Sequence, residues 1–294
     1  MNLRDYLAAQ QKLVDAELDR VVPPAALPPE TIHRAMRYSL FAGGKRIRPI
    51  LCLEAARTVS DASDGAVTAA CALELIHTYS LIHDDLPALD NDDYRRGKLT
   101  CHKVFGEAMA ILAGDALLTL AFEVLTCMPE TPAERRARML SELAAAGGTV
   151  GGMIAGQVAD LEGEGQPPSA PLLESIHRAK TGALLRASLR LGAIYAGAGD
   201  TQYDALSCYG EHIGLAFQIV DDILDVEESS AALGKTAGKD AAQHKITFPA
   251  VYGVQESRSM AERECAQAHA TLAPFGARAE RLHELADLIV HRKS

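Results

Sequence analysis

Apolar residues recur at helical spacing along most of this chain, and no segment alternates apolar and polar residues with the period of a β-strand. Ala and Leu dominate the composition, Trp is absent, and aromatic residues make up only 5%. Such a composition favours helices packed on helices over a β sandwich or barrel. The sequence therefore predicts an all-α fold, a bundle of about ten or more helices.

Prolines and glycines divide the helical pattern into segments. Four prolines lie within residues 21–29, and Pro87 breaks a long apolar helix. We expect helices over residues 2–20, 30–42, 49–59, 64–86, 106–127, 133–161, 172–197, 201–228, 243–256, 258–272 and 276–291. The loops are short and evenly spread, including the clearest one at residues 163–171. Residues 1–294 are therefore expected to form a single domain.

The charge balance limits the partners of the chain. A net charge of −10 argues against a general surface for nucleic acids or acidic membranes. Any polyanionic ligand must then be held by a local group of cations or by metal ions. No uninterrupted apolar run approaches about 18 residues, so neither a membrane span nor stable membrane insertion is expected.

The cysteines indicate a reduced environment. Six of them lie far apart in the sequence, namely Cys52, Cys71, Cys101, Cys127, Cys208 and Cys265. No pair has the Cys-x-x-Cys spacing, so we expect neither a zinc motif nor a redox motif. Residues 1–5 show no secretory apolar core. The simplest interpretation is a reduced, cytoplasmic chain.

Two aspartate clusters each follow an apolar helical stretch. The first comprises Asp84, Asp85 and Asp90, and the second comprises Asp221, Asp222 and Asp225. A buried carboxylate without a partner is costly, and divalent cations are the usual partners of such groups. The two clusters therefore suggest Mg²⁺ held around a very anionic substrate.

The second cluster has a regular helical geometry. Asp221 and Asp225 are four residues apart and share one helix face, and Gln218 lies one turn earlier on that face. A solvated face is the alternative. Solvated faces usually mix Lys and Glu, whereas this stripe has three Asp and no cation of its own.

The first cluster does not fit a regular helix. Asp84 and Asp90 would lie about 120° apart on an ideal helix, but Pro87 disrupts the turn between them, so a helix end could bring them together. An exposed loop rich in turn formers is the alternative. Arg95 and Arg96 follow, and paired guanidinium groups can hold phosphate oxygens.

A glycine-rich turn at residues 43–49 carries further cations. Its sequence, Gly-Gly-Lys-Arg-Ile-Arg-Pro, presents Lys45 and Arg48 just before a helix, where an anion could bind. A basic helix cap exposed to solvent is the alternative. His77 lies two helical turns before Asp84, so the two share a face, although a satisfied core histidine has the same pattern.

Two later segments also carry candidate cations. Lys180, followed by Thr181, places one cation on an otherwise apolar helix, where a snorkelling lysine is the alternative. Residues 226–247 are interrupted by Gly and Ser and contain Lys235. A lid that closes over a substrate and an ordinary exposed loop both fit this pattern.

Together these segments resemble the trans-isoprenyl diphosphate synthases, with the bacterial farnesyl diphosphate (geranyltranstransferase) branch as the nearest match. The resemblance runs from about residue 30 to the C-terminus. It is carried by GGKRIRP at 43–49, LIHDDLPALDNDDYRRG at 81–97, AILAGDALLTLAFEVL at 110–125, GQVADLEGE at 156–164, KTGALLRASLRLGA at 180–193, GLAFQIVDDILDVE at 214–227 and GKTAGKDAAQHKITFP at 234–249. It implies an all-α fold around a central cavity, usually assembled as a homodimer.

The resemblance also implies roles for individual residues. Metal ions, in the form of three Mg²⁺ that Mn²⁺ can replace, would be held by Asp84, Asp85, Asp90, Asp221, Asp222 and Asp225. An allylic diphosphate would be contacted by Arg95, Lys180 and Lys235. Isopentenyl diphosphate would be bound by Lys45, Arg48, His77 and Arg96. Thr181 and Gln218, with backbone carbonyls near Lys180, would face the developing carbocation. Asn91 departs from the pattern, because close relatives often have Asp there.

The implied reaction is head-to-tail prenyl transfer. Isopentenyl diphosphate would condense with dimethylallyl and then geranyl diphosphate to give farnesyl diphosphate and pyrophosphate. Tyr79 and Ser80, five and four residues before Asp84, would form the floor that ends growth at C15. A geranylgeranyl or longer-chain synthase is the nearest alternative. A terpene cyclase fits less well because its second metal motif differs, and a non-catalytic subunit fits less well because both aspartate clusters are complete.

Overall fold

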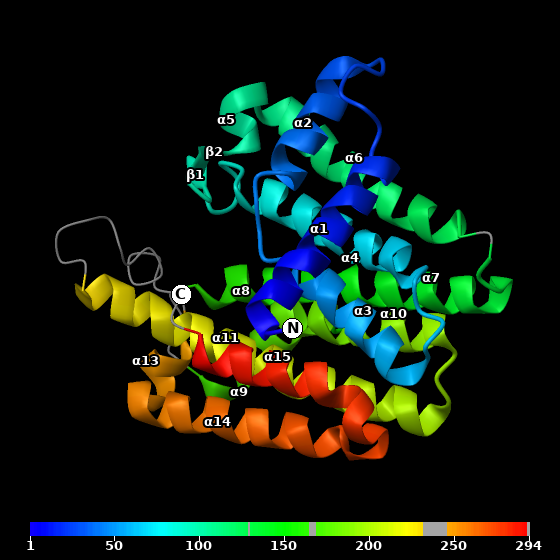
Figure 1. The fold of residues 1–294 in the computed structure, drawn as a ribbon. Helices are drawn as coiled ribbons and strands as arrows, with labels where there is room; N and C mark the ends of the chain where they lie inside the picture. The colour runs from blue at the N-terminus through cyan, green and yellow to red at the C-terminus, as the bar shows by residue number, and fades with distance from the viewer. Residues whose placement is uncertain (129, 165–168, 232–245, 293–294) are drawn as a thin grey trace. The chain divides into compact units, whose positions relative to one another are not determined.

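The predicted all-α fold is confirmed. A computed structural model describes residues 1–128, 130–164, 169–231 and 246–292, and nearly all of its secondary structure is helical (Figure 1). The chain falls into two compact units. Unit 1 comprises Met1–Leu53 and Ala62–Leu140, and unit 2 comprises Glu54–Asp61 and Ser141–Ser294. The single domain expected over residues 1–294 stays a prediction.

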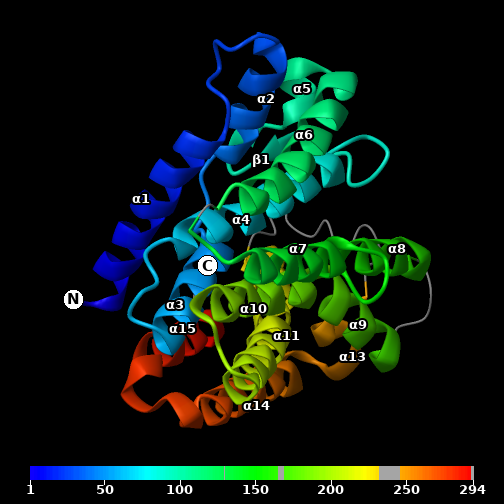
Figure 2. The same ribbon diagram turned by 90° about the vertical axis from the view of Figure 1, so that its right-hand side faces the viewer.

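Unit 1 is built around one buried helix. Its elements are α1 (Leu3–Val21), α2 (Glu30–Leu40), the first half of α3 (Ile47–Val59), α4 (Ala66–Asp84), β1 (Tyr94–Arg95), β2 (Lys98–Leu99), α5 (Cys101–Phe105), α6 (Glu107–Thr126) and the start of α7 (Ala133–Gly147). Helix α4 is buried on almost every side, as its continuous apolar sequence requires, and it packs along α6 (Figure 2). A Cβ on Gly114 of α6 would lie only 2.1 Å from His83 Nε2 of α4, so glycine permits this close packing.

Helix α6 is the one described helix that is long and apolar enough to cross a membrane. Helices in protein cores often have the same length and composition, and 39% of the apolar window of α6 is buried, including Ala110, Ala113 and Leu117. The expectation that the chain makes no stable membrane insertion stays a prediction.

A short hairpin in unit 1 was not predicted. Tyr94 of β1 pairs with Leu99 of β2, and Arg95 pairs with Lys98. The two residues of the turn, Arg96 and Gly97, both have positive φ, at 52° and 75°. This is the type I′ geometry that fits a two-residue hairpin. Strands of two residues are too short to show an alternating pattern in the sequence.

Unit 2 packs its helices around α11. Its elements are the remainders of α3 and α7, α8 (Met153–Gly163), α9 (Ala170–His177), a π-helical turn η1 (Arg178–Gly182), α10 (Ala183–Ala196), α11 (Asp200–Ala231), α13 (Phe248–Tyr252), α14 (Val254–Thr271), a 3₁₀ segment η2 (Ala273–Ala279) and α15 (Glu280–His291). Ile219 and Ile223 of α11 are buried with Leu173 of α9, Phe248 of α13 and Ala261 of α14.

The single helix expected over residues 133–161 is wrong. The structure ends α7 at Gly147 and begins α8 at Met153. Gly151 has a φ of +65°, and a Cβ on Gly152 would lie 2.4 Å from the Ala145 carbonyl oxygen. Both positions therefore need glycine, and the glycines that looked tolerable within one helix instead form the connection between two.

Two other boundaries also differ. The helix expected over residues 172–197 begins at Ala170 and contains the π-helical turn η1 before it continues as α10. The break expected between residues 256 and 258 lies at Gly253, which has a φ of +81° and separates α13 from α14. The other expected helices are present, with ends shifted by a few residues.

Candidate active site

The first aspartate cluster lies where α4 ends in unit 1. Beyond Asp84 the chain folds back, because the Asp90 amide donates to the Asp84 carbonyl at 2.8 Å and the Asp92 amide donates to the Asp85 carbonyl at 3.2 Å. Asn91 has a φ of 50°, a conformation that Asn tolerates better than most residues. The expected helix end is confirmed, and the unusual Asn91 has a backbone role in it.

The three carboxylates of this cluster differ in exposure. Asp85 is only 3% exposed and accepts a forked contact from Arg95, with Nη2 to Oδ1 at 2.6 Å and Nε to Oδ2 at 3.0 Å. Asp84 and Asp90 are partly exposed. Arg95 therefore neutralises the buried member, while the other two reach solvent.

Three of the four residues predicted to bind isopentenyl diphosphate lie together in unit 1. Burial lowers the pKa of His77 well below its usual value, and the positive charges of Arg48, Arg96 and Arg95 lower it further. His77 is therefore a neutral ring among guanidinium groups at neutral pH. Lys45, the fourth residue, is exposed on the turn before α3.

The turn that carries these cations is fixed by a buried arginine. Arg46 has a φ of 53° and is 3% exposed, and it bonds Glu74 at 2.8 Å, Asp15 at 2.8 Å and the Leu40 carbonyl at 2.7 Å. Arg96 donates to the Gly43 carbonyl, and a Cβ on Gly44 would lie 2.7 Å from Arg96 Nη1. Gly44 thus lets the hairpin arginine lie against the turn.

The predicted chain-length residues lie one turn before Asp84 on α4. Tyr79 is 6% exposed, and its ring meets His83 edge to face with centroids 5.7 Å apart. Burial, helped by the charge of Asp84, raises the pKa of Tyr79 to about 12. The Ser80 hydroxyl donates to the His77 carbonyl at 2.9 Å and is therefore committed to its own helix.

In unit 2 a chain of hydrogen bonds links the π-helical turn to α13. Thr181 Oγ1 donates to Gln218 Oε1 at 2.9 Å, and Gln218 Nε2 donates to Asp222 Oδ1 at 3.0 Å. The Phe248 amide donates to Asp222 Oδ2 at 2.9 Å. Asp222 is 4% exposed, so its carboxylate holds the start of α13. Its predicted metal role stays a prediction.

Lys180 pairs with a carboxylate that the sequence analysis did not select. Its Nζ lies 2.6 Å from Asp160 Oδ2 of α8. The helices can approach because a Cβ on Gly156 would lie 2.2 Å from the Lys180 backbone nitrogen. Asp160 lies in the GQVADLEGE segment, and its place one turn after Gly156 was the available signal. The π-helical turn at Lys180 also fits a functional position, because such turns are frequent at functional sites.

In the second cluster Asp221 is partly exposed and Asp225 is exposed. Arg292, just beyond α15, donates to Asp221 Oδ1 at 2.5 Å and to the Phe217 carbonyl at 3.0 Å, and its guanidinium lies 4.0 Å from the Phe217 ring centre. Arg292 is a second residue that the sequence analysis missed, because it lies 71 positions from Asp221. Lys235 lies outside the described residues.

The donor set fits a divalent metal. Asp84 and Asp90 in unit 1, and Asp221 and Asp225 in unit 2, offer partly or fully exposed carboxylate oxygens, which Mg²⁺ prefers over nitrogen or sulfur. Asp85 and Asp222 are buried with other partners. Each predicted metal-binding cluster thus contains two accessible carboxylates and one buried carboxylate that is bonded to other groups of the protein.

An all-α chain with one aspartate cluster at a helix end, a second within a long helix, and an arginine cluster around a neutral histidine is suited to binding diphosphates and metal ions. The family model described as Polyprenyl synthetase matches residues 29–278, and the chain belongs to that family. It is 50% identical to a dimethylallyltranstransferase of Fischerella ambigua, over 99% of this chain and 84% of that protein. It is 44% identical to a geranylgeranyl diphosphate synthase of Cyanophora paradoxa, over 100% and 97% of the two chains.

A solved structure is similar throughout its length. An FPP/GFPP synthase from Zymomonas mobilis superimposes with a TM-score of 0.86, at 37% identity, covering 97% of this chain and 99% of that one. The protein is therefore a prenyltransferase that joins prenyl units head to tail. Members of the family depend on a divalent metal.

Gln218→Ala tests the hydrogen-bond chain of unit 2. It removes the acceptor of Thr181 and the amide donor of Asp222, so we expect prenyl transfer to slow by about 10- to 100-fold, as for other groups that orient carboxylates near metals. The matched control is Gln255→Ala on the exposed face of α14, which should keep full activity. Steady-state turnover measures both. Equal activity of the two variants would contradict the role of Gln218.

Proposed function

We propose that the protein elongates allylic diphosphates with isopentenyl diphosphate, first dimethylallyl and then geranyl diphosphate, and releases farnesyl diphosphate and pyrophosphate. The observation that carries this proposal is the group of Arg48, His77 and Arg96. This group provides positive charges for a second diphosphate. It is distinct from the aspartate clusters, which would bind the first diphosphate through metal ions. Chain elongation needs such a second site, whereas cyclisation of a single substrate does not.

The metal in this proposal is Mg²⁺, as three ions that Mn²⁺ can replace. Asp84, Asp85, Asp90, Asp221, Asp222 and Asp225 would hold it, with Asp85 and Asp222 as the buried members. When bound, the metal stabilises the negative charge that develops on the leaving diphosphate. Since Arg95 now pairs with Asp85, and Lys180 with Asp160, these cations can turn to the phosphate oxygens when substrate arrives. Lys235 would join them.

The carbocation would be stabilised by oxygen atoms of the chain. The allylic C–O bond breaks and leaves its electron pair on the diphosphate. The double bond of isopentenyl diphosphate then forms the new C–C bond, and the released pyrophosphate takes the proton that leaves. Thr181 Oγ1 and Gln218 Oε1 lie within 2.9 Å of each other, so two oxygen dipoles are fixed in place beside the carbonyls near Lys180.

Product length is assigned to Tyr79. Its buried ring, one turn before Asp84, would stop the growing chain at C15, with Ser80 beside it. A geranylgeranyl synthase is the second candidate, because several relatives carry that name, including the one from Cyanophora paradoxa.

Incubation of the protein with isopentenyl diphosphate, dimethylallyl diphosphate and Mg²⁺ tests the function, with products separated by chromatography. We expect C15 from the wild type and C20 or longer from Tyr79→Ala, because removal of the ring opens the floor. Tyr79→Phe keeps the ring and should still give C15. No elongation at all would overturn the proposed function, and C20 from the wild type would support the geranylgeranyl alternative. If Tyr79→Ala still gives only C15, Tyr79 is not the floor.

Binding of isopentenyl diphosphate should depend on pH through His77. Its pKa in the free protein is well below 6.5, and a bound diphosphate favours the protonated ring and raises this pKa. The complex then binds more protons than the free protein, so affinity rises as pH falls from about 7.5 to 5. The dissociation constant is measured over this range for wild type and His77→Gln. Titration of the ligand affects both proteins equally, so an identical slope in both would contradict the prediction.

The assembly is proposed to be a homodimer. Ile111 and Leu112 of α6 are 44% and 53% exposed, and Leu112 lines an apolar groove with Ile32 and Met36 of α2 and Met109. An apolar surface of this kind suits a second copy of the chain. Light scattering should give twice the mass of one 31.4 kDa chain, and Leu112→Glu should shift the measured mass toward that of one chain.

The six free thiols support a reduced, cytoplasmic location.

A further inference from the structure

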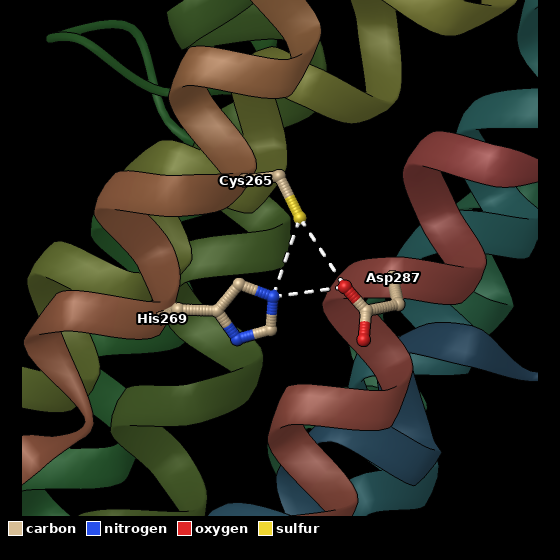
Figure 3. A group of neighbouring side chains, drawn as sticks. All are labelled: Cys265, His269 and Asp287. Carbon is tan, nitrogen blue, oxygen red and sulfur yellow. Dashed lines mark hydrogen bonds and ion pairs between the residues drawn. The ribbon is translucent and has the colours of Figure 1, made fainter.

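Three side chains of unit 2 form a cluster that the proposed reaction does not use. Cys265 and His269 lie one turn apart on α14, and Asp287 faces them from α15 (Figure 3). Cys265 Sγ lies 3.6 Å from His269 Nε2 and 3.8 Å from Asp287 Oδ1, and His269 Nε2 lies 2.9 Å from Asp287 Oδ1. A thiol, an imidazole and a carboxylate thus point at one spot from two different helices.

The spacing of these three atoms fits one tetrahedral ion. Zinc bond lengths and tetrahedral angles place a sulfur ligand about 3.6 Å from a nitrogen or oxygen ligand, and place a nitrogen about 3.3 Å from an oxygen. The distances of 3.6, 3.8 and 2.9 Å in the structure differ from these values by less than about half an ångström. Small side-chain adjustments would therefore bring all three atoms onto one ion, with a fourth position open to water.

A fourth residue orients the histidine of the cluster. His283 lies one turn before Asp287 on α15, and its Nδ1 is 2.5 Å from His269 Nδ1. One of these nitrogens must donate and the other accept. If His269 Nε2 binds a metal, its Nδ1 carries the proton and donates to His283, as the second nitrogen of a metal-binding histidine usually does.

We propose that Cys265, His269 and Asp287 bind a single Zn²⁺ that joins α14 to α15. The thiol proton leaves to solvent when the sulfur binds, and the ion is shared by one soft and two harder donors, a combination that suits zinc rather than Mg²⁺. Cys265 is 6% exposed while Asp287 is exposed, so an ion could enter from the Asp287 side.

A zinc site on α14 and α15 was not expected from the sequence. The lack of a Cys-x-x-Cys pair predicted no zinc motif. That spacing is typical of tight turns, however, and here each helix supplies a pair four residues apart, Cys265 with His269 and His283 with Asp287. The three ligands and the orienting His283 can be recognised as one site only when the two helices are known to face each other.

Cobalt binding tests the proposal on the full chain. The protein is stripped with a chelator, Mg²⁺ is added in excess to occupy the carboxylate sites, and Co²⁺ is then titrated. We expect one equivalent to produce the near-ultraviolet thiolate-to-cobalt absorption and the visible bands of a tetrahedral site, and Zn²⁺ to remove both. The absence of a thiolate-to-cobalt band would overturn the proposal and leave the cluster as a hydrogen-bond network.

Matched variants identify the thiol and its neighbours. Cys265→Ser should abolish the band, whereas Cys208→Ser, at an exposed cysteine of α11, should keep it. Asp287→Asn, at an exposed position, should weaken Zn²⁺ binding by tenfold or more, and His283→Ala should weaken it by about 10- to 100-fold while the band remains. A band that survives Cys265→Ser, or unchanged Zn²⁺ affinity in Asp287→Asn, would overturn the assignment.

Discussion

Pairing of carboxylates with nearby cations is the interaction on which the site of each unit depends. Asp85 holds Arg95, Asp160 holds Lys180, and Asp221 holds Arg292. Neighbouring carboxylates of a cluster repel one another, and each ion pair removes part of that repulsion before any ligand arrives. Because Arg95 and Lys180 are also the proposed ligands of the allylic diphosphate, substrate binding becomes an exchange of partners. In the proposed reaction the basic groups would leave their carboxylates for phosphate oxygens, and Asp85 would then be able to hold metal.

The sequence predicted the elements well where proline or continuous apolar spacing defined them. The end of α4 before Pro87 and the long α11 are examples. It failed where backbone conformation decided the outcome. Gly151 and Gly152 looked tolerable inside a helix, but their positions need glycine and separate α7 from α8. The turn at Arg96 and Gly97 depends on positive φ in both residues. The flanking strands have only two residues each, so no alternating pattern in the sequence indicates the turn.

For the site, the sequence supplied residue types and the structure supplied their partners. His77 could be linked to Asp84 by helical spacing, but its position among Arg48 and Arg96 depends on a turn and a hairpin far apart in the chain. Helical spacing placed Asp221 and Asp225 on one face, but it could not show what Asp222 contacts. The structure buries Asp222 against Gln218 and the Phe248 amide and leaves Asp221 accessible. Asp160 and Arg292 were missed because their contacts bridge separate helices.

The π-helical turn η1 has a consequence for how insertions and deletions act here. A π turn holds one residue more than an α-helical turn. The buried face of α9 is therefore rotated about the helix axis by about 100° relative to that of α10, compared with an uninterrupted helix. Loss of a single residue between Arg178 and Gly182 would restore a regular helix and rotate Leu173 and Ile176 of α9 away from the core they now fill. The rotation of α9 about its axis, and the direction in which the Lys180 side chain extends, thus depend on the number of residues in this segment as much as on their identity.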